Sequence, residues 1–290
     1  FFRAMATAGV QVHPFFKVTF PQLANRVNWR NHRKIVIIDS SIGYIGGMNI
    51  ADRYEQGSSP GQVWRDTHFR VRGDIVESLT YSFVVDWNFG NQPLQMELPR
   101  KSPVPFHNST GMQLVTSGPM GEWDNISLCF LKAISSATKC IYIQTPYFLP
   151  TDALQHALEA ASLSRIDVRI MIPRKSDSRL LQFASFSYVT KCLRAGMKVY
   201  LYNPGMLHAK GMIIDDNLVT AGSTNFDFRS FENNFESNLF IYDREVNRKM
   251  RDIFFSDMGS CSKVTYSAWI KRPLPQRFME STIRLFSPIL

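Results

Sequence analysis

Short hydrophobic runs recur along the chain, separated by polar or glycine-containing turns, and their periods predict both strands and helices. The runs at 140–149, 167–173 and 198–203 are rich in β-branched and aromatic residues, which predicts strands. Between them, hydrophobic positions at 152–163 and 179–196 recur at helical spacing. Strands that alternate with helices indicate an α/β fold whose sheet is substantially parallel and covered by helices.

One segment of the sequence is present twice. Residues 32–49, HRKIVIIDSSIGYIGGMN, match residues 208–225, HAKGMIIDDNLVTAGSTN, at a constant offset and without a gap. In each copy a hydrophobic run, a polar turn and a second hydrophobic run predict two strands joined by a turn. Because a repeat at constant offset indicates one structural unit used twice, we expect two lobes related by approximate two-fold symmetry.

The two copies also predict the domain organisation. We assign residues 1–98 to a first lobe, 99–112 to a linker and 113–290 to a second lobe. The linker lies in a proline-rich stretch, which is typical of a semi-rigid spacer. The strands and helices that precede the second copy have no counterpart before the first copy. We therefore expect the first lobe to lack its N-terminal part and the chain to be a fragment.

Composition indicates the class of protein, and net charge indicates which kinds of molecule it binds. With 44% hydrophobic and 20% charged residues, the 290-residue chain resembles an ordinary folded globular protein. Its formal net charge of +9 favours anionic partners, whether nucleic acid, acidic lipid or phosphorylated substrates. No hydrophobic run approaches the roughly 18 residues of a membrane-spanning helix. The four cysteines form no C-x-x-C pair, which favours reduced thiols in a cytosol-facing protein over a zinc or redox centre.

Each copy of the repeat contains the pattern His-x-Lys, as His32 and Lys34 in the first and as His208 and Lys210 in the second. Residues two apart on a strand point the same way, so each histidine and its lysine project side by side. Approximate two-fold symmetry would bring both pairs into one pocket between the lobes. Lysine ammonium groups can neutralise the non-bridging oxygens of a phosphodiester. The sequence therefore predicts a phosphodiester site.

The rest of the repeat supplies further groups for such a reaction. Asn49 and Asn225, at the ends of the two copies, are expected to donate hydrogen bonds to the phosphate oxygens. One neutral imidazole can attack phosphorus and form a phosphohistidine, while the other can protonate the leaving alkoxide and later deprotonate an incoming alcohol or water. Because the lysines fill the role of a metal cation, we expect neither a metal nor a cofactor.

Four acidic residues accompany the two motifs. Asp39 and Asp215 complete the repeated pattern and are included in the candidate catalytic set. Seven positions after a histidine, however, a regular strand places them on the opposite face, which favours a role in fixing the strand. Asp66 and Glu236 introduce the strands that follow the motifs, and we expect them to orient the histidines through the second ring nitrogen. Pairing with a neighbouring arginine is the alternative.

At these residues the sequence resembles a known family. The paired HxKxxxxD units with trailing Gly and Asn are similar to the phospholipase D superfamily, and WRDTHFRVRG, IQTPYFLPTDAL and GSTNFDFRSFENNFE narrow the resemblance to bacterial cardiolipin synthases. The resemblance implies a pseudo-dimer of two α/β lobes, each a mixed, largely parallel sheet flanked by helices, with one active site at their interface. It also implies His32 as the nucleophile and His208 as the general acid and base.

The same resemblance implies a reaction and a location. Two phosphatidylglycerol molecules would be joined into cardiolipin with release of glycerol, without a metal. The enzyme would be attached to a bacterial cell membrane through segments outside this chain, with its active site facing the cytoplasm. The expected partner is an anionic phospholipid at the membrane surface.

Other functions stay open from the sequence. Water in place of the acceptor alcohol would give a hydrolytic phospholipase D or a nuclease, and a charge of +9 suits DNA as well as acidic lipid. Nucleic acid is the less expected partner, because no aromatic stacking platform is evident. A third possible function is that of a catalytically inactive binding protein with the same fold, and the two intact His-Lys-Asn sets argue against it.

Two segments outside the repeat carry expectations of their own. Residues 269–290 mix basic with large hydrophobic side chains, so the segment can lie on an anionic membrane surface or cover the core of the second lobe. The aromatic stretch at 145–150 can line an acyl or headgroup entrance, although core packing is the simpler expectation.

Overall fold

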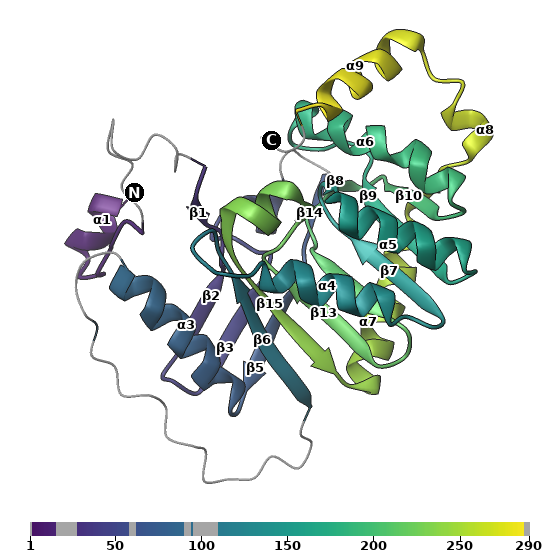
Figure 1. Cartoon of the computed structure of the whole chain (residues 1–290). Coiled ribbons are helices and arrows are strands. Elements are labelled where there is room, and N and C mark those ends of the chain that lie inside the picture. Colours follow the sequence, from purple (N-terminus) through teal and green to yellow (C-terminus); the bar gives the residue numbers. More distant parts are fainter. Residues whose placement is uncertain (1, 16–27, 58–61, 90–93, 95–109, 287–290) are drawn as a thin grey trace.

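The computed structural model describes residues 2–15, 28–57, 62–89, 94 and 110–286. Within this part of the chain, helices lie on both sides of a large mixed sheet (Figure 1). This sheet has nine strands, and β6 (Gly111–Ser117) pairs with β15 beside the main order. The order of the other eight is β1 (Arg30–Asn31), β15 (Asn234–Tyr242), β13 (Leu218–Gly222), β12 (Gly211–Ile214), β7 (Cys140–Gln144), β9 (Asp167–Pro173), β10 (Lys198–Tyr202) and β16 (Cys261–Lys263).

The predicted α/β class with a mixed sheet is confirmed, but parallel pairing is less extensive than the sequence suggested. Strands β7, β9 and β10 are parallel and connected by α5 (Asp152–Leu163) and α6 (Arg179–Arg194), as their alternation predicted. Strand β12 is antiparallel to β7 and β13, and β15 is antiparallel to β13 and β6, whereas the short β1 is parallel to β15. The reason is local, because the short turn between β12 and β13 can only form a hairpin.

The first copy of the repeat forms a separate antiparallel sheet of β2 (Ile35–Ile38), β3 (Ile42–Gly46) and β5 (His68–Arg72). Its order, β2-β3-β5, reproduces the order β12-β13-β15 of the second copy. The register agrees as well, since Gly46 lies opposite His68 and Gly222 lies opposite Asn238. The strand–turn–strand unit predicted for each copy is therefore confirmed, and β5 and β15 are equivalent third strands.

The remaining elements complete the two halves. They are α1 (Phe2–Thr7), α2 (Arg53–Gln56), β4 (Val63–Arg65), α3 (Ile75–Phe89), α4 (Asn125–Ser135), β8 (Phe148–Leu149), β11 (Gly205–Leu207), β14 (Phe226–Asp227), a π-helix at Arg229–Asn233, α7 (Arg244–Gly259), α8 (Tyr266–Trp269) and α9 (Leu274–Arg284). Of these, α3 packs against the three-stranded sheet, and β11 and β4 pair across the two halves of the chain.

Hydrophobic packing joins the two copies of the repeat. One core cluster contains Ile45 and Leu79 from the first half together with Leu207 and Leu239 from the second, and all four side chains are fully buried. Burial of each such side chain contributes about 1.5–3 kcal/mol. The two sheets therefore share a core, which fixes their relative position and with it the site between them.

The predicted domain boundaries are only partly covered by the structure. Residues 99–109 of the expected linker lie outside the described residues, and β6 begins at Gly111, inside the range assigned to the linker. In the described part of the chain, no helix combines the length and the hydrophobicity that crossing a membrane requires.

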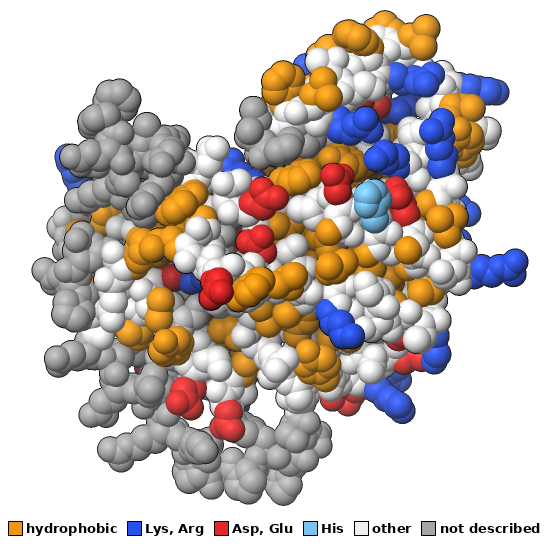
Figure 2. Space-filling view, viewed as in Figure 1, with side chains coloured by type: hydrophobic (Ala, Val, Ile, Leu, Met, Phe, Trp, Pro, Cys, Tyr) orange, Lys and Arg blue, Asp and Glu red, His pale blue; other side chains and the backbone are white. Residues whose placement is uncertain are grey.

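The C-terminal segment has two different faces. Trp269 and Ile283 are buried in the core cluster that includes α6, so one face covers the second half of the chain. On the other face Leu274, Phe278 and Leu285 are 74%, 70% and 76% exposed. Figure 2 shows hydrophobic and basic side chains together at this end of the molecule. Core covering is thus confirmed for the inner face, and membrane contact stays a prediction for the outer one.

Candidate active site

Two short parallel pairings bring the halves of the site together. Just before His32, β1 pairs with the start of β15, and the His32 amide donates to the carbonyl oxygen of Phe235 at 2.9 Å. Just before His208, β11 pairs with β4, and the His208 amide donates to the carbonyl oxygen of Arg65 at 2.7 Å. Each histidine is therefore aligned with a strand from the other half of the chain, His32 with the beginning of β15 and His208 with the end of β4.

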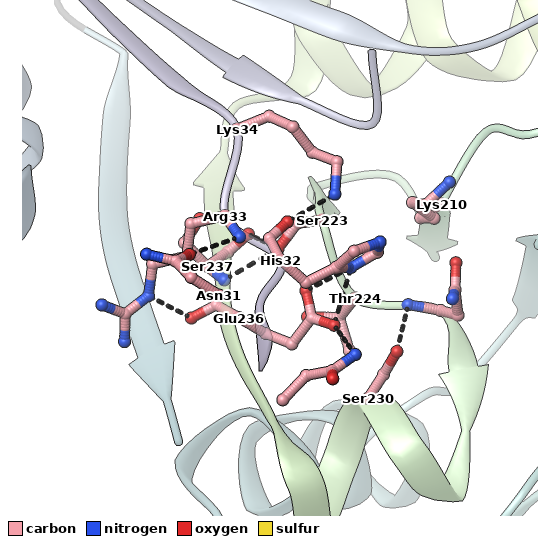
Figure 3. Close-up of polar contacts among 12 residues, drawn as sticks. Asn31, His32, Arg33, Lys34, Lys210, Ser223, Thr224, Ser230, Glu236 and Ser237 are labelled. Atoms are coloured by element: carbon pink, nitrogen blue, oxygen red, sulfur yellow. Dashed lines mark hydrogen bonds and ion pairs between the residues drawn. The ribbon is translucent and has the colours of Figure 1, made fainter. Parts of the chain in front are cut away.

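This alignment places Glu236 beside His32 (Figure 3). The Nδ1 atom of His32 lies 2.9 Å from Oε1 of Glu236, whose side chain is fully buried. The Ser223 hydroxyl and the Asn234 amide also donate to this carboxylate. Burial alone would raise the pKa of Glu236, but His32, the charge of Lys34 and the hydrogen bond from Ser223 hold it below its usual value. A charged Glu236 keeps the proton of neutral His32 on Nδ1 and leaves the Nε2 lone pair for chemistry.

The pairing of β11 with β4 places Asp66 beside His208. Oδ2 of Asp66 lies 2.7 Å from Nδ1 of His208, and Oδ1 accepts the Thr67 amide at 2.7 Å. The Asp66 carboxylate can occupy this position because residue 47 is glycine, since a Cβ atom there would collide with it. Arg65, which could have neutralised its neighbour, instead forms an ion pair with Asp257 at 3.1 Å.

His208 is more enclosed than His32, with side-chain exposures of 9% and 28%. The rings of Tyr54 and Trp64 lie 6.2 and 5.5 Å from its imidazole centroid. The Tyr54 hydroxyl is 3.2 Å from Nδ1. Burial, reinforced by the nearby charge of Lys210, lowers the pKa of His208 to about 4, although Asp66 opposes the shift. Without a bound anion, His208 is therefore neutral near pH 7.

Both lysines of the repeat lie in this cluster. The Lys34 Nζ donates to the His32 carbonyl oxygen at 2.5 Å, and the Lys210 Nζ donates to the His208 carbonyl oxygen. Burial lowers the pKa of Lys34 to about 8 and that of Lys210 to about 7, and nearby carboxylates only partly oppose this shift. The charge of Lys34 also lowers the pKa values of His208 and Lys210, so the two copies of the motif form one electrostatic site.

The two asparagines occupy different environments. The Asn225 side chain is 8% exposed, and its Oδ1 atom has no hydrogen-bond partner in the described part of the chain. The Asn49 amide donates to the Tyr54 hydroxyl at 3.3 Å. Asn49 is therefore partly engaged by Tyr54, and donation from the two asparagines to a phosphate stays a prediction. Among the described residues, no three His, Cys, Asp or Glu side chains are grouped to hold a metal ion.

The two motif aspartates lie at hairpin turns and away from the histidines. Asp39 and Asp215 both have φ of 49°, a left-handed conformation that aspartate tolerates better than most residues. The Asp215 carboxylate accepts backbone N–H groups of Thr138, Lys139 and Cys140 at 2.7–3.2 Å. Burial would raise the pKa of Asp215, but these hydrogen bonds hold it below its usual value. This geometry favours the structural role expected from the strand-face argument.

Sequence reasoning missed several residues of the site. Ser223 occupies the position of Gly47 in the aligned repeat, so a difference between the two copies was the available signal. Tyr54 and Trp64 come from a short helix and a short strand outside the repeat, and single aromatic residues there give no periodic signal. Arg33 binds Asp86 and donates to the Glu236 carbonyl oxygen at 3.1 Å, which supports the strand that carries Glu236.

Comparisons with known proteins relate the sequence of this chain to cardiolipin synthases. Residues 130–258 match the family model described as cardiolipin synthase, PLD-like domain. The chain is 40% identical over 292 residues to a cardiolipin synthase of Listeria monocytogenes and 42% identical over 297 residues to the major cardiolipin synthase of Bacillus subtilis. In both cases all of this chain is covered, and it spans only 61% of the relative.

A solved structure shows the same fold. A phosphatidylserine synthase of Haemophilus influenzae matches with a TM-score of 0.71 at 16% sequence identity. The match covers 91% of this chain and 72% of the other. At this identity the likeness concerns the fold alone.

Proposed function

The chain belongs to the phospholipase D superfamily, and we propose that it acts as a cardiolipin synthase. Its substrates would be two molecules of phosphatidylglycerol at a membrane surface. The observation that carries the proposal is the pair of imidazoles, each held by a carboxylate from the other copy of the repeat, in one cluster with two buried lysines.

In the first half-reaction, Nε2 of neutral His32 attacks the phosphorus of the donor lipid. A P–N bond forms, the bond from phosphorus to the glycerol oxygen breaks, and His208 gives its proton to that oxygen. Glu236 stabilises the positive charge that develops on the His32 ring. Lys34 and Lys210 stabilise the charge on the non-bridging oxygens. His32 is assigned as nucleophile because its ring is the more exposed of the two.

His208 must carry a proton in this step, although it is neutral without a ligand. The negative charge of the donor phosphate opposes the effects that lower its pKa, namely burial and the neighbouring lysine charge. Substrate binding would therefore favour protonation of His208. In the second half-reaction His208 is neutral again and removes the proton from the acceptor hydroxyl. The hydroxyl oxygen attacks phosphorus, the P–N bond breaks, and cardiolipin leaves with both histidines regenerated.

Product analysis tests the proposal. The protein in its full natural length is incubated with phosphatidylglycerol vesicles, and the lipid products and free glycerol are quantified. We expect cardiolipin and glycerol in equal amounts. Phosphatidic acid as the sole lipid product would mean that water is the acceptor and would refute the transferase. Untouched lipid in this assay, together with cleavage of DNA in a parallel incubation, would favour the nuclease.

A further inference from the structure

The guanidinium group of Arg53 lies at the outer edge of the aromatic wall around His208. Its carbon is 4.6 Å from the ring centroid of Trp64 and 5.9 Å from that of Tyr54. The same two rings lie 5.5 and 6.2 Å from the His208 imidazole. Arg53 is exposed, whereas Trp64 is buried. A molecule that approaches His208 along this wall therefore meets Arg53.

The charge of Arg53 is not neutralised by a protein carboxylate in the described part of the chain. Its neighbours Asp52 and Glu55 form no ion pair with it. Stacking on an aromatic ring covers the face of a guanidinium but leaves its N–H groups free to donate. Such a group is well suited to bind two oxygens of one phosphate.

Tyr147, in the second half of the chain, also interacts electrostatically with Arg53. Tyr147 lies between β7 and β8, and its hydroxyl donates to Asp177 at 2.6 Å. Burial raises the pKa of Tyr147 above its usual value, and the positive charge of Arg53 partly opposes that rise. Arg53 therefore lies within electrostatic reach of Tyr147. The core packing expected for the stretch at 145–150 is confirmed for Phe148 and Leu149, which are buried, and an entrance for a headgroup stays a prediction.

The proposed reaction needs a second place for an anion. The acceptor phosphatidylglycerol carries its own phosphate, separated by three carbon atoms from the hydroxyl that attacks phosphorus. During that attack the hydroxyl lies beside His208, while Lys34 and Lys210 hold the phosphate that is being transferred. The acceptor phosphate must therefore lie a few ångströms farther out, on the side from which the acceptor arrives.

We propose that Arg53 binds the phosphate of the acceptor lipid, an inference that rests on the proposed function. Arg53 would then be a specificity residue that favours an anionic alcohol over water or a neutral alcohol. It takes no part in breaking the donor bond. Water and free glycerol carry no phosphate, so their reactions do not depend on Arg53.

The test compares two acceptors in one enzyme. Cardiolipin formation from phosphatidylglycerol is measured beside the exchange of labelled glycerol into phosphatidylglycerol, in which the acceptor is neutral. In Arg53→Gln we expect cardiolipin formation to fall about tenfold or more, as for loss of a charge-assisted phosphate contact, with glycerol exchange nearly unchanged. Arg53→Lys should recover part of the loss, because it restores the charge without the planar fork.

The control is Arg72→Gln, which removes the same charge from an exposed position at the end of β5. It should leave both reactions unchanged. Equal losses of both reactions in Arg53→Gln would place Arg53 in the catalytic machinery and overturn the acceptor site, as would no loss in either. A wild-type enzyme that forms no cardiolipin would instead refute the proposed function, and the acceptor site with it.

Discussion

The Nδ1 atom of His32 lies 2.9 Å from Oε1 of Glu236, a residue 204 positions later in the chain. The reciprocal contact joins His208 to Asp66 across 142 positions. Neither histidine is thus oriented by its own copy of the repeat. The contacts that prepare the imidazoles for chemistry are also contacts between the two halves of the molecule, so any change that separates the halves disturbs both histidines together.

Replacement of Glu236 tests the importance of these contacts between the two halves. Glu236→Gln keeps the shape of the side chain but removes the charge that stabilises a positive His32, so we expect kcat to fall by about 100-fold or more. Steady-state kinetics with phosphatidylglycerol would measure the loss. Glu280→Gln is the matched control, because Glu280 is also buried and pairs with Arg272 in the C-terminal segment. A similar loss in both variants would point to a general folding effect.

Donors with different leaving groups distinguish the roles of the two histidines. A p-nitrophenolate leaving group needs little protonation, so His208→Ala and Asp66→Asn should still release it in a single burst from a p-nitrophenyl phosphodiester. His32→Ala should show no burst, because it has no nucleophile. Rapid-mixing absorbance would record the burst. The opposite pattern, with a burst only in His32→Ala, would assign the nucleophile to His208.

Much of the site could be located from the repeat, because a pattern of identical residues at identical spacing can be recognised without knowledge of the fold. The repeat identified His32 and His208 with their lysines, and β-branched runs located most strands of the second half. It could not reveal which carboxylate meets which histidine. That depends on β1 pairing with β15 and β11 with β4, and pairings between distant short strands leave no periodic pattern in the sequence.

The motif aspartates show a second limit of the sequence. The strand argument expected Asp215 to lie away from the histidine, and its carboxylate does lie at the hairpin turn, but His208 precedes β12 and is not part of that strand. The argument also did not predict the left-handed turn conformation or the three backbone N–H groups that donate to the carboxylate. Turn geometry depends on where the strand ends, and strand ends are set by pairing partners elsewhere in the chain.

Asp215→Ala should destabilise the 290-residue chain without removing its chemistry. Loss of the carboxylate leaves three backbone N–H groups without this acceptor, so we expect the free energy of unfolding to fall by about 1–3 kcal/mol. Asp39→Ala is the comparison within the same protein, since Asp39 has the same φ but an exposed side chain. Denaturant unfolding should show the larger loss for Asp215→Ala. Equal losses would mean that turn conformation alone explains the effect.

The outer face of α9 is expected to contact an anionic membrane. Leu274→Glu and Phe278→Glu each replace an exposed hydrophobic side chain by a negative charge, which the anionic lipid repels. Each should weaken vesicle binding about tenfold. Flotation with phosphatidylglycerol vesicles would measure binding, which should also weaken as salt increases. Leu163→Glu is the control, because Leu163 is 71% exposed at the end of α5. Equal effects at all three positions would argue against a specific membrane face.

Binding of a phosphodiester should be accompanied by proton uptake. Burial holds the pKa of Lys210 at about 7 and that of Lys34 at about 8, so near pH 8 the unliganded site lacks part of its positive charge. A bound anion stabilises the protonated lysines and raises both pKa values. Protons are therefore taken up on binding, and affinity should weaken as pH rises through this range.

Titration calorimetry with glycerophosphoglycerol, in two buffers of different protonation enthalpy, measures the number of protons exchanged. His32→Ala serves as the background because it binds without turnover. In Lys210→Arg on this background the uptake should decrease, since arginine stays charged whether or not the ligand is bound. Proton release on binding, or the same uptake in both proteins, would show that the buried lysines are not the groups that respond to the phosphate.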